Sequence, residues 1–133
     1  MKSRDTLIRL KRFQAEEKRR RVAQIEAMIA EFGRMAGDLD REIALEEQRS
    51  GITDMSHFAY STYARAARVR RDNLKQSTED LRPQLAEAMT AHAEALEELA
   101  KVQNLDGREK GERPEPFRDR ADIDMIGMVA PRL

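Results

Sequence analysis

Apolar residues recur at alternating intervals of three and four along two long stretches of this chain. In the first stretch they are Val22, Ile25, Ile29, Phe32, Ala36, Leu39 and Ile43. The second series includes three polar members and consists of Tyr60, Ala64, Ala67, Arg71, Leu74, Thr78, Leu81, Leu85, Ala88, His92, Ala95, Leu99 and Val102. A period close to 3.5 residues is typical of helices that pair along a narrow seam in a coiled coil, and the alanines would let the helices approach closely.

The composition favours the same kind of structure. Of the 133 residues, 38% are charged and only 5% are aromatic, with no Trp. So few bulky side chains cannot fill a broad globular core, but they are enough for long solvated helices with a narrow seam. We therefore expect an all-α protein with one folded domain.

Gly, Pro and polar residues divide the chain into two predicted helices. The first helix is predicted over about residues 4–49, with Ser3 as its N-cap. The sequence RSGITDMS then predicts a turn over residues 50–55, in which Gly51 takes the left-handed conformation that follows many helices. The second helix is predicted over about residues 56–105. Three polar residues are candidates for its N-cap: Thr53, Asp54 and Ser56.

Three residues inside the predicted helices are unfavourable for helix formation. Gly33 and Gly37 each weaken the first helix by roughly 1 kcal/mol relative to Ala. Pro83 removes one backbone hydrogen bond from the second helix, and its ring clashes with the preceding turn. We therefore expect a kink in the second helix at Pro83.

The remaining residues, 106–133, are predicted to form a flexible tail. The sequence DGREKGERPEP is polar and rich in Pro and Gly, so we expect the tail to be mostly disordered to about Asp119. Its end, ADIDMIGMVAPRL, differs because it contains a short apolar segment at 121–130. Two interpretations stay open: the segment folds on a partner, or it docks back on the helices. The apolar members are Ile123, Met125, Ile126, Met128 and Val129.

The distribution of charge favours pairing of the two helices within one chain. Net charge is +6 over residues 1–21, −4 over 22–50, +2 over 51–82, −4 over 83–106 and zero over the tail. Folding back at Gly51 sets segments of opposite sign side by side, whereas two parallel chains in register would set +6 against +6. Because flanking charges set orientation in coiled coils, we expect a long two-helix antiparallel coiled-coil hairpin over residues 1–105, in a monomer.

The chain offers little chemistry for catalysis or metal binding. It has no Cys, and its two histidines, His57 and His92, lie 35 residues apart in the sequence, about 52 Å along a helix. No metalloprotease motif, phosphate-binding loop or nucleophile elbow occurs. We therefore expect no enzymatic activity, no cofactor and no metal, and we expect His92 to pack on the seam.

Nucleic-acid and membrane binding are also disfavoured. The runs KRRR and RVRR are basic, but the net charge is zero and no aromatic residues alternate with either run. No stretch approaches the roughly 20 apolar residues of a membrane span, and the N-terminal sequence lacks the apolar core of a secretory signal. We therefore expect a cytoplasmic protein with no direct membrane insertion and no nucleic-acid partner.

The basic run from Lys18 to Arg21 interrupts the apolar pattern of the first helix. Extending the heptad backwards from Val22 places Lys18, Ala15, Lys11 and Ile8 on the seam. Leu10 and Phe13 then project from the opposite side, bordered by Arg9, Arg12, Arg19 and Arg20. An exposed Leu–Phe pair among arginines has the character of a protein-interaction surface.

A stutter in the heptad is the alternative explanation of the same run. It would bring a different set of side chains onto one seam: Leu10, Phe13, Glu17, Arg21, Ile25 and Ile29. Glu17 and Arg21 would then face the second helix near His92 and Glu94, and the arginines would pair within the hairpin instead of serving a partner.

Two sequences, SRDTLIRLKRFQAEEKRRRVAQIEAMIAEF and HFAYSTYARAARVRRDNL, carry a resemblance to a known family. Over about residues 1–105 the chain resembles the FliJ family, the stalk proteins of the flagellar type III export apparatus, in its α-proteobacterial form. The resemblance implies a hairpin similar to the central γ stalk of rotary ATPases. It also implies that the end bearing the termini enters the ring of the hexameric flagellar export ATPase and promotes its assembly and activity.

The same resemblance implies further partners and a location. The hairpin would contact the cytoplasmic domain of the export gate, and would so couple ATP hydrolysis and proton motive force to protein export. It would also take part in the recycling of export chaperones. The protein would be cytoplasmic and peripheral at the cytoplasmic face of the inner membrane, held there through the export apparatus, and would serve flagellum assembly and motility.

Carried onto this sequence, the resemblance gives two sets of partner-binding residues. The end that enters the ATPase ring would hold Leu10, Arg12, Phe13, Lys18, Arg19, Arg20 and Arg21. For the export gate the candidates are Phe58 and Tyr63, for which packing around the end of the hairpin is an equally open interpretation. The alternative function is a generic coiled-coil adaptor or export chaperone without ATPase contact.

Overall fold

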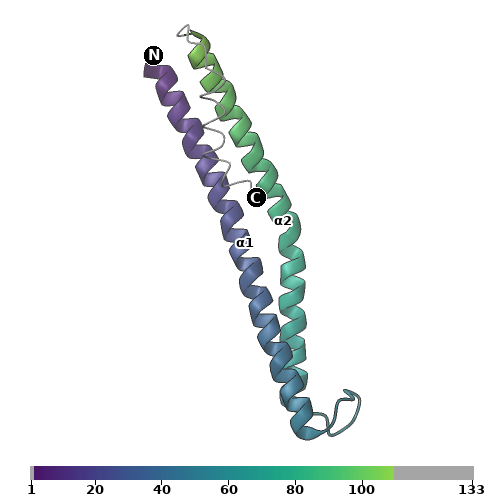
Figure 1. Cartoon of the computed structure of the whole chain (residues 1–133). Coiled ribbons are helices and arrows are strands. Elements are labelled where there is room, and N and C mark those ends of the chain that lie inside the picture. Colours follow the sequence, from purple (N-terminus) through teal and green to yellow (C-terminus); the bar gives the residue numbers. More distant parts are fainter. Residues whose placement is uncertain (1, 110–133) are drawn as a thin grey trace, which may run out of the picture. The chain divides into compact units, whose positions relative to one another are not determined.

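The structure is a computed structural model and describes residues 2–109. These residues form two long helices and the connection between them. Helix α1 spans Lys2–Ser50 and helix α2 spans Thr62–Glu109. The helices pack against each other in opposite directions, as Figure 1 shows. The prediction of an all-α, antiparallel helical hairpin is thereby confirmed.

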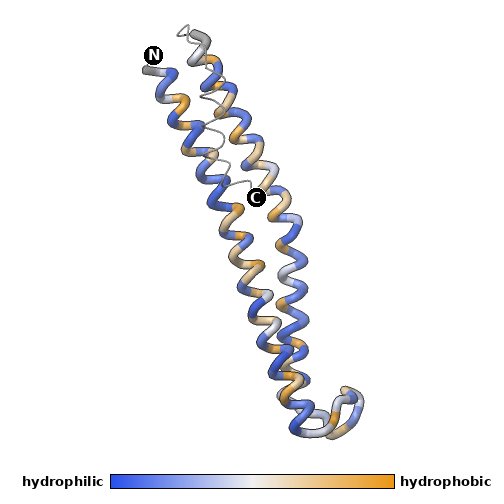
Figure 2. The backbone as a smooth tube through the Cα atoms, viewed as in Figure 1, coloured by the Kyte–Doolittle hydropathy of each residue, from blue (hydrophilic) through white to orange (hydrophobic). Residues whose placement is uncertain are grey.

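The chain divides into two compact units, and each is described by itself. One unit, called the terminal unit here, includes residues 2–14 and 95–109 of the described part. The other, called the loop unit, consists of Ala15–Glu94 and includes the connection between the helices. In both units, apolar residues recur at intervals along α1 and α2 between hydrophilic stretches, as the colours of Figure 2 show.

The core of the loop unit is a narrow seam. One cluster is built on Ile25, Leu81 and Ala88, and a second on Leu39, Ile43 and Ala67. Val22, Ile29, Phe32 and Leu85 pack against the first cluster, and Leu74 packs against the second. Ile25 is only 1% exposed. All heptad positions predicted from Val22 to Ile43 and from Tyr60 to His92 are buried or half-buried, so the predicted register is confirmed.

The terminal unit follows the same register. Val102 is buried, and Ile8, Ala95 and Leu99 are half-buried. The unstuttered heptad had placed Ile8 on the seam, so its backward extension along α1 is confirmed in this unit. In the loop unit Ala15 is buried as predicted, whereas Lys18 is exposed, because its long side chain carries the ammonium group into solvent.

Helix α1 ends as the sequence predicts. Gly51 has a positive φ of 77°, and its N–H donates to the carbonyl of Glu47 at 2.8 Å. Glycine adopts this left-handed conformation without the steric cost that a Cβ would add. The Ser50 hydroxyl accepts a hydrogen bond from the N–H of Ile52 at 3.2 Å, which holds the first residues of the connection.

The start of α2 was predicted wrongly. The helix begins at Thr62, and its N-cap is Ser61, whose hydroxyl accepts a hydrogen bond from the N–H of Ala64 at 3.1 Å. Asp54 instead caps a local turn, accepting from the N–H of Ser56 at 3.0 Å. Residues 51–61 therefore form a longer connection than the predicted turn over 50–55, and none of the three predicted residues is the cap: Thr53, Asp54 and Ser56.

Three smaller differences concern helix interiors and ends. Helix α1 begins at Lys2, so Ser3 lies inside the helix and is not its N-cap. Helix α2 continues through Pro83 and on to Glu109, four residues beyond the predicted end. Residues 110–133, with the predicted apolar segment at 121–130, lie outside the described residues. Within residues 2–109, neither helix is apolar enough over a sufficient length to cross a membrane.

Candidate partner-binding surfaces

The terminal unit exposes three large apolar side chains on α1. Leu7, Leu10 and Phe13 are 41%, 48% and 58% exposed, and together they are called the Leu10 face. They are exposed because Ile8 occupies the seam. Side chains one position before Ile8, and two and five positions after it, point to other sides of the helix. The stutter would have buried Leu10 and Phe13, so that alternative was wrong and the outward orientation is confirmed.

Two arginines flank the Leu10 face. Arg9 and Arg12 are exposed, and neither takes part in an ion pair with another residue of the part that the structure describes. Arg9 lies one turn before Phe13 on the same side of α1. Lys11, in contrast, turns toward α2 and pairs with Glu98 at 3.7 Å. The cations of this stretch therefore separate into one that holds the two helices together and two that remain available to a partner.

The basic run of the loop unit separates in a similar way. Arg19 donates from Nε to Glu16 at 3.0 Å, and Arg20 donates to Glu17 at 2.7 Å. The Arg19 hydrogen bond is the main cause that lowers the pKa of Glu16, and Glu16 in turn raises the pKa of Arg19. These pairs join residues three apart on α1, so the arginines do not reach α2.

The other two cations of the run differ from these two arginines. Lys18 and Arg21 are exposed, and among residues 2–109 neither forms an ion pair. All seven residues predicted to face the ATPase ring are therefore exposed. Among residues 2–109, carboxylates pair with two of these seven, Arg19 and Arg20.

The connection between the helices presents an aromatic side chain to solvent. Phe58 is 96% exposed and stacks on the ring of His57, with the ring centroids 4.9 Å apart. Phe58 lies in the connection and not on α2 as predicted. Nδ1 of His57 accepts a hydrogen bond from the N–H of Ala59 at 2.9 Å, which fixes the orientation of the imidazole.

Tyr63 lies near the start of α2 and is also exposed. Its hydroxyl donates to Glu42 of α1, and this carboxylate raises the pKa of Tyr63. Phe58 and Tyr63 are thus both exposed, and Tyr63 in addition contacts α1 near the end of the hairpin through its hydroxyl.

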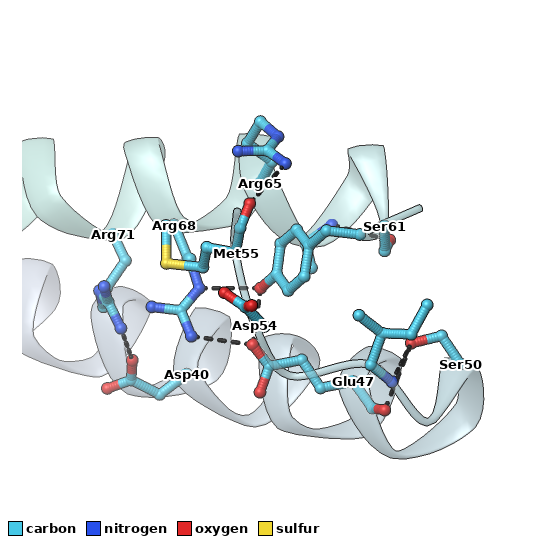
Figure 3. Close-up of polar contacts among 12 residues, drawn as sticks. Asp40, Glu47, Ser50, Asp54, Met55, Ser61, Arg65, Arg68 and Arg71 are labelled. Carbon is cyan, nitrogen blue, oxygen red and sulfur yellow. Dashed lines mark hydrogen bonds and ion pairs between the residues drawn. The ribbon is translucent and has the colours of Figure 1, made fainter. Parts of the chain in front are cut away.

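A polar network that the sequence analysis missed fixes this connection. Tyr60 is 4% exposed, and its hydroxyl donates to Glu47 at 2.6 Å. Arg68 donates from Nε to the Tyr60 hydroxyl and from Nη2 to Glu47, both at 2.8 Å. Figure 3 shows Arg68 and Glu47 pointing toward one another from the two helices. The hydrogen bonds from Arg68 and then from Tyr60 lower the pKa of Glu47.

Two further arginines complete the network in Figure 3. The guanidinium of Arg65 lies over the Tyr60 ring at 5.2 Å and donates to the Met55 carbonyl at 2.9 Å. Arg71 pairs with Asp40 at 2.8 Å, which explains an arginine at a heptad position. The opposite charges of the two helices were visible in the sequence. The participation of Tyr60 was not, because it depends on how the chain turns between residues 51 and 61.

A shallow, open depression of about 400 Å³ lies beside the connection, lined by Glu42, Leu45, Glu46, Arg49 and Tyr63. Its carboxylates already have partners, since Glu46 pairs with Arg49 at 3.0 Å and Glu42 accepts from Tyr63. Within residues 2–109, no three side chains of metal-binding type lie close enough together to hold a metal ion.

The fold and these surfaces describe one class of protein, a helical hairpin with apolar and basic surfaces exposed along its helices and at its connection. No family model matches the chain, and the comparisons with curated proteins and with solved structures found no match. The resemblance to the FliJ family therefore rests on the sequence alone.

Proposed function

We propose that this protein is a non-enzymatic stalk and regulator of the flagellar type III export ATPase. The observation that carries the proposal is the Leu10 face, where Leu10 and Phe13 are exposed beside two arginines that have no ion pair among the described residues. The hairpin fold supports the proposal, because the resemblance to the FliJ family implies an antiparallel hairpin.

The physical chemistry of the Leu10 face suits a protein partner. Leucine and phenylalanine lose contact with water when a partner covers them, which contributes roughly 25 cal/mol per Å² of apolar surface buried. Phenylalanine and arginine are among the residues enriched at protein interfaces, and charged borders steer a partner of opposite charge into register. A partner with an apolar pocket bordered by carboxylates would match this arrangement, and we assign that role to the ATPase ring.

A second surface would serve the cytoplasmic domain of the export gate. Phe58 projects almost fully into solvent from a connection that hydrogen bonds hold in place, and Tyr63 is exposed nearby in the sequence. An aromatic side chain that is already fixed in position loses little conformational entropy on binding. This favours Phe58 as the principal gate-binding residue, with export chaperones as further partners of the assembly.

The decisive experiment compares two matched variants. The ATPase rate and the hexamer content of the export ATPase are measured with the wild-type protein, with Phe13→Ala and with Val69→Ala. Val69 is similarly exposed but lies on α2 and outside the proposed site. We expect Phe13→Ala to weaken binding by about tenfold or more, and Val69→Ala to bind as the wild type does.

The outcome also separates the two functions that the sequence allows. Wild-type protein that leaves both the rate and the oligomeric state of the ATPase unchanged would contradict the proposal. A protein that bound export substrates under those conditions would instead be an adaptor or export chaperone without ATPase contact.

A further inference from the structure

The Leu10 face is an apolar surface that residues 2–109 leave uncovered. Leu7, Leu10 and Phe13 are all more than 40% exposed, on a helix whose seam side is already packed. A cluster of large apolar side chains on a protein surface is costly in water, and it usually marks a binding site. Twenty-four residues of the same chain, 110–133, follow the end of α2.

We propose that residues 121–130 of the same chain bind to the Leu10 face. Five of the seven positions from 123 to 129 are apolar: Ile123, Met125, Ile126, Met128 and Val129. Their apolar side chains provide surface that can cover leucine and phenylalanine, and methionine adapts well to irregular surfaces.

The chain between α2 and this segment has a suitable length. Helix α2 ends in the terminal unit, where Nη1 of Arg4 donates to the carbonyl of Leu105 at 3.3 Å, so the start of α1 lies beside the end of α2. Positions 109 and 123 are fourteen residues apart in the sequence, and a flexible chain of that length has an average end-to-end distance of about 20 Å. Phe13 lies about 14 Å along α1 from Arg4. Tethering is most effective when the linker length matches the distance to be spanned.

Charge favours this segment over a second copy of the protein. Residues 121–130 carry Asp122 and Asp124 and no cation. The Leu10 face is flanked by Arg9 and Arg12, which are exposed and have no ion pair within the described residues. A symmetric dimer through this face would bring the arginines of one copy close to those of the other, and like charges across an interface are unfavourable.

Binding of the segment would regulate access to the Leu10 face. A partner would meet an open face only in the fraction of molecules from which the segment has dissociated, and its apparent affinity would fall in proportion. This regulatory consequence rests on the proposed function, whereas the intramolecular binding itself does not.

The absence of Cys from the chain makes a direct test possible. In the full-length protein, one thiol is introduced by Gln14→Cys and a second by Ala130→Cys. Gln14 is exposed and lies one turn after Leu10 on the same side of α1. The matched control combines Ala130→Cys with Ala100→Cys, which is exposed on α2 in the terminal unit. Each protein, at micromolar concentration, is oxidised with copper phenanthroline. The rate at which the disulfide forms within one chain is measured.

We expect the disulfide between positions 14 and 130 to form about tenfold faster than the control, because binding raises the local concentration of the two thiols. Adding Ile126→Asp should remove this advantage, and so should adding Asp122→Lys with Asp124→Lys. Circular dichroism of each variant verifies that the helices are intact.

Equal rates in the two proteins would overturn the proposal. So would disulfide-linked dimers as the main product at rising protein concentration, because the face would then bind a second copy. No ATPase is present, so a failure of the proposed function would leave this result unaffected, and the reverse also holds.

Discussion

Tyr60 is a residue whose side chain serves both the apolar seam and a polar network. Its ring is buried at the end of the connection, just before α2, and its hydroxyl hydrogen-bonds to both Glu47 and Arg68. We expect Tyr60→Phe to keep the packing of the ring but to lower the free energy of unfolding by about 1 kcal/mol, because two hydrogen bonds are lost. Urea unfolding followed by circular dichroism measures the change.

Tyr63→Phe is the matched control for that variant. The Tyr63 ring is exposed and its hydroxyl donates to Glu42 at the surface, where water can replace the hydrogen bond. We expect its urea midpoint to equal that of the wild type. Equal losses for Tyr60→Phe and Tyr63→Phe would show that the network does not stabilise the connection.

The carboxylate of Glu47 predicts a pH dependence. Its pKa in the folded protein lies below the ordinary value of 4.5, because Arg68 and then Tyr60 hydrogen-bond to the charged form. A carboxylate with a depressed folded pKa contributes stability that is fully present above its unfolded pKa and is lost as the pH falls through the folded pKa. We therefore expect thermal stability to fall below pH 4.5, and to fall less steeply in Glu47→Gln.

The Glu47→Gln variant should reduce this acid sensitivity without abolishing it. Glu16 and Asp54 also have lowered pKa values, owing to hydrogen bonds from Arg19 and Ser56 respectively. A wild-type melting temperature that stayed constant from pH 6 to pH 3 would contradict the assignment of these hydrogen bonds to stability.

Replacing a glycine by alanine should have opposite effects on stability inside α1 and directly after its end. Gly33 lies in the helix interior, and a Cβ added there would meet no atom within 4 Å. We expect Gly33→Ala to raise the free energy of unfolding by about 1 kcal/mol, since Ala has the higher helix propensity. Gly51→Ala should lower it by a similar amount, because φ is 77° at this position. Thermal unfolding of the two variants measures both effects.

At the scale of the helix, two double charge reversals within the basic run of α1 can be compared, because both change the charge by the same amount. Lys18 and Arg21 have no ion pair among the described residues, whereas Arg19 and Arg20 pair with Glu16 and Glu17. We expect the double change Lys18→Glu and Arg21→Glu to weaken binding of the export ATPase more than Arg19→Glu and Arg20→Glu. Lys18 and Arg21 can bind a partner's carboxylates without first breaking an ion pair with a described residue of the chain, whereas Arg19 and Arg20 cannot.

Both double variants should keep their helix content, because Lys, Arg and Glu have similar helix propensities. Binding is measured at two salt concentrations, since screening weakens contacts between exposed charges. Wild-type affinity that does not change with salt would contradict a role for the run in binding.

The helices and their register could be predicted from the sequence because a local periodicity determines which side of each helix is buried. Ile25 and Leu81 follow the heptad, and so does Arg71, whose partner Asp40 lies on the oppositely charged segment. The start of α2 could not be predicted, because several polar residues between 53 and 61 are equally able to cap a helix. The choice of Ser61 depends on the turns that residues 54–60 make first.

Of the candidate surfaces, the sequence predicts the parts that depend on the register of a single helix. The exposure of Leu10 and Phe13 follows from the register of one helix. The network around Tyr60 joins residues 13 and 21 positions distant from Glu47, and nothing in the local sequence indicates that pairing. Predicting such long-range polar contacts requires the path of the backbone in space as well as the periodicity of the sequence.

At the scale of the whole molecule, the charge distribution predicts a monomer. The +6 segment at residues 1–21 would face itself in a parallel dimer in register, whereas the antiparallel hairpin avoids that repulsion. Light scattering coupled to size-exclusion chromatography should give the mass of one chain, 15.3 kDa, at micromolar concentration. A mass of two chains that persists on dilution would contradict this expectation.

The placement of the tyrosines gives the protein its own optical probe. The chain has two tyrosines and no tryptophan, and both tyrosines flank the start of α2, so near-ultraviolet absorption and emission report mainly on the connection. Far-ultraviolet signals report on the two helices instead. Recording both during one titration with a binding partner therefore shows whether the connection responds separately from the helices, without any label attached to the protein.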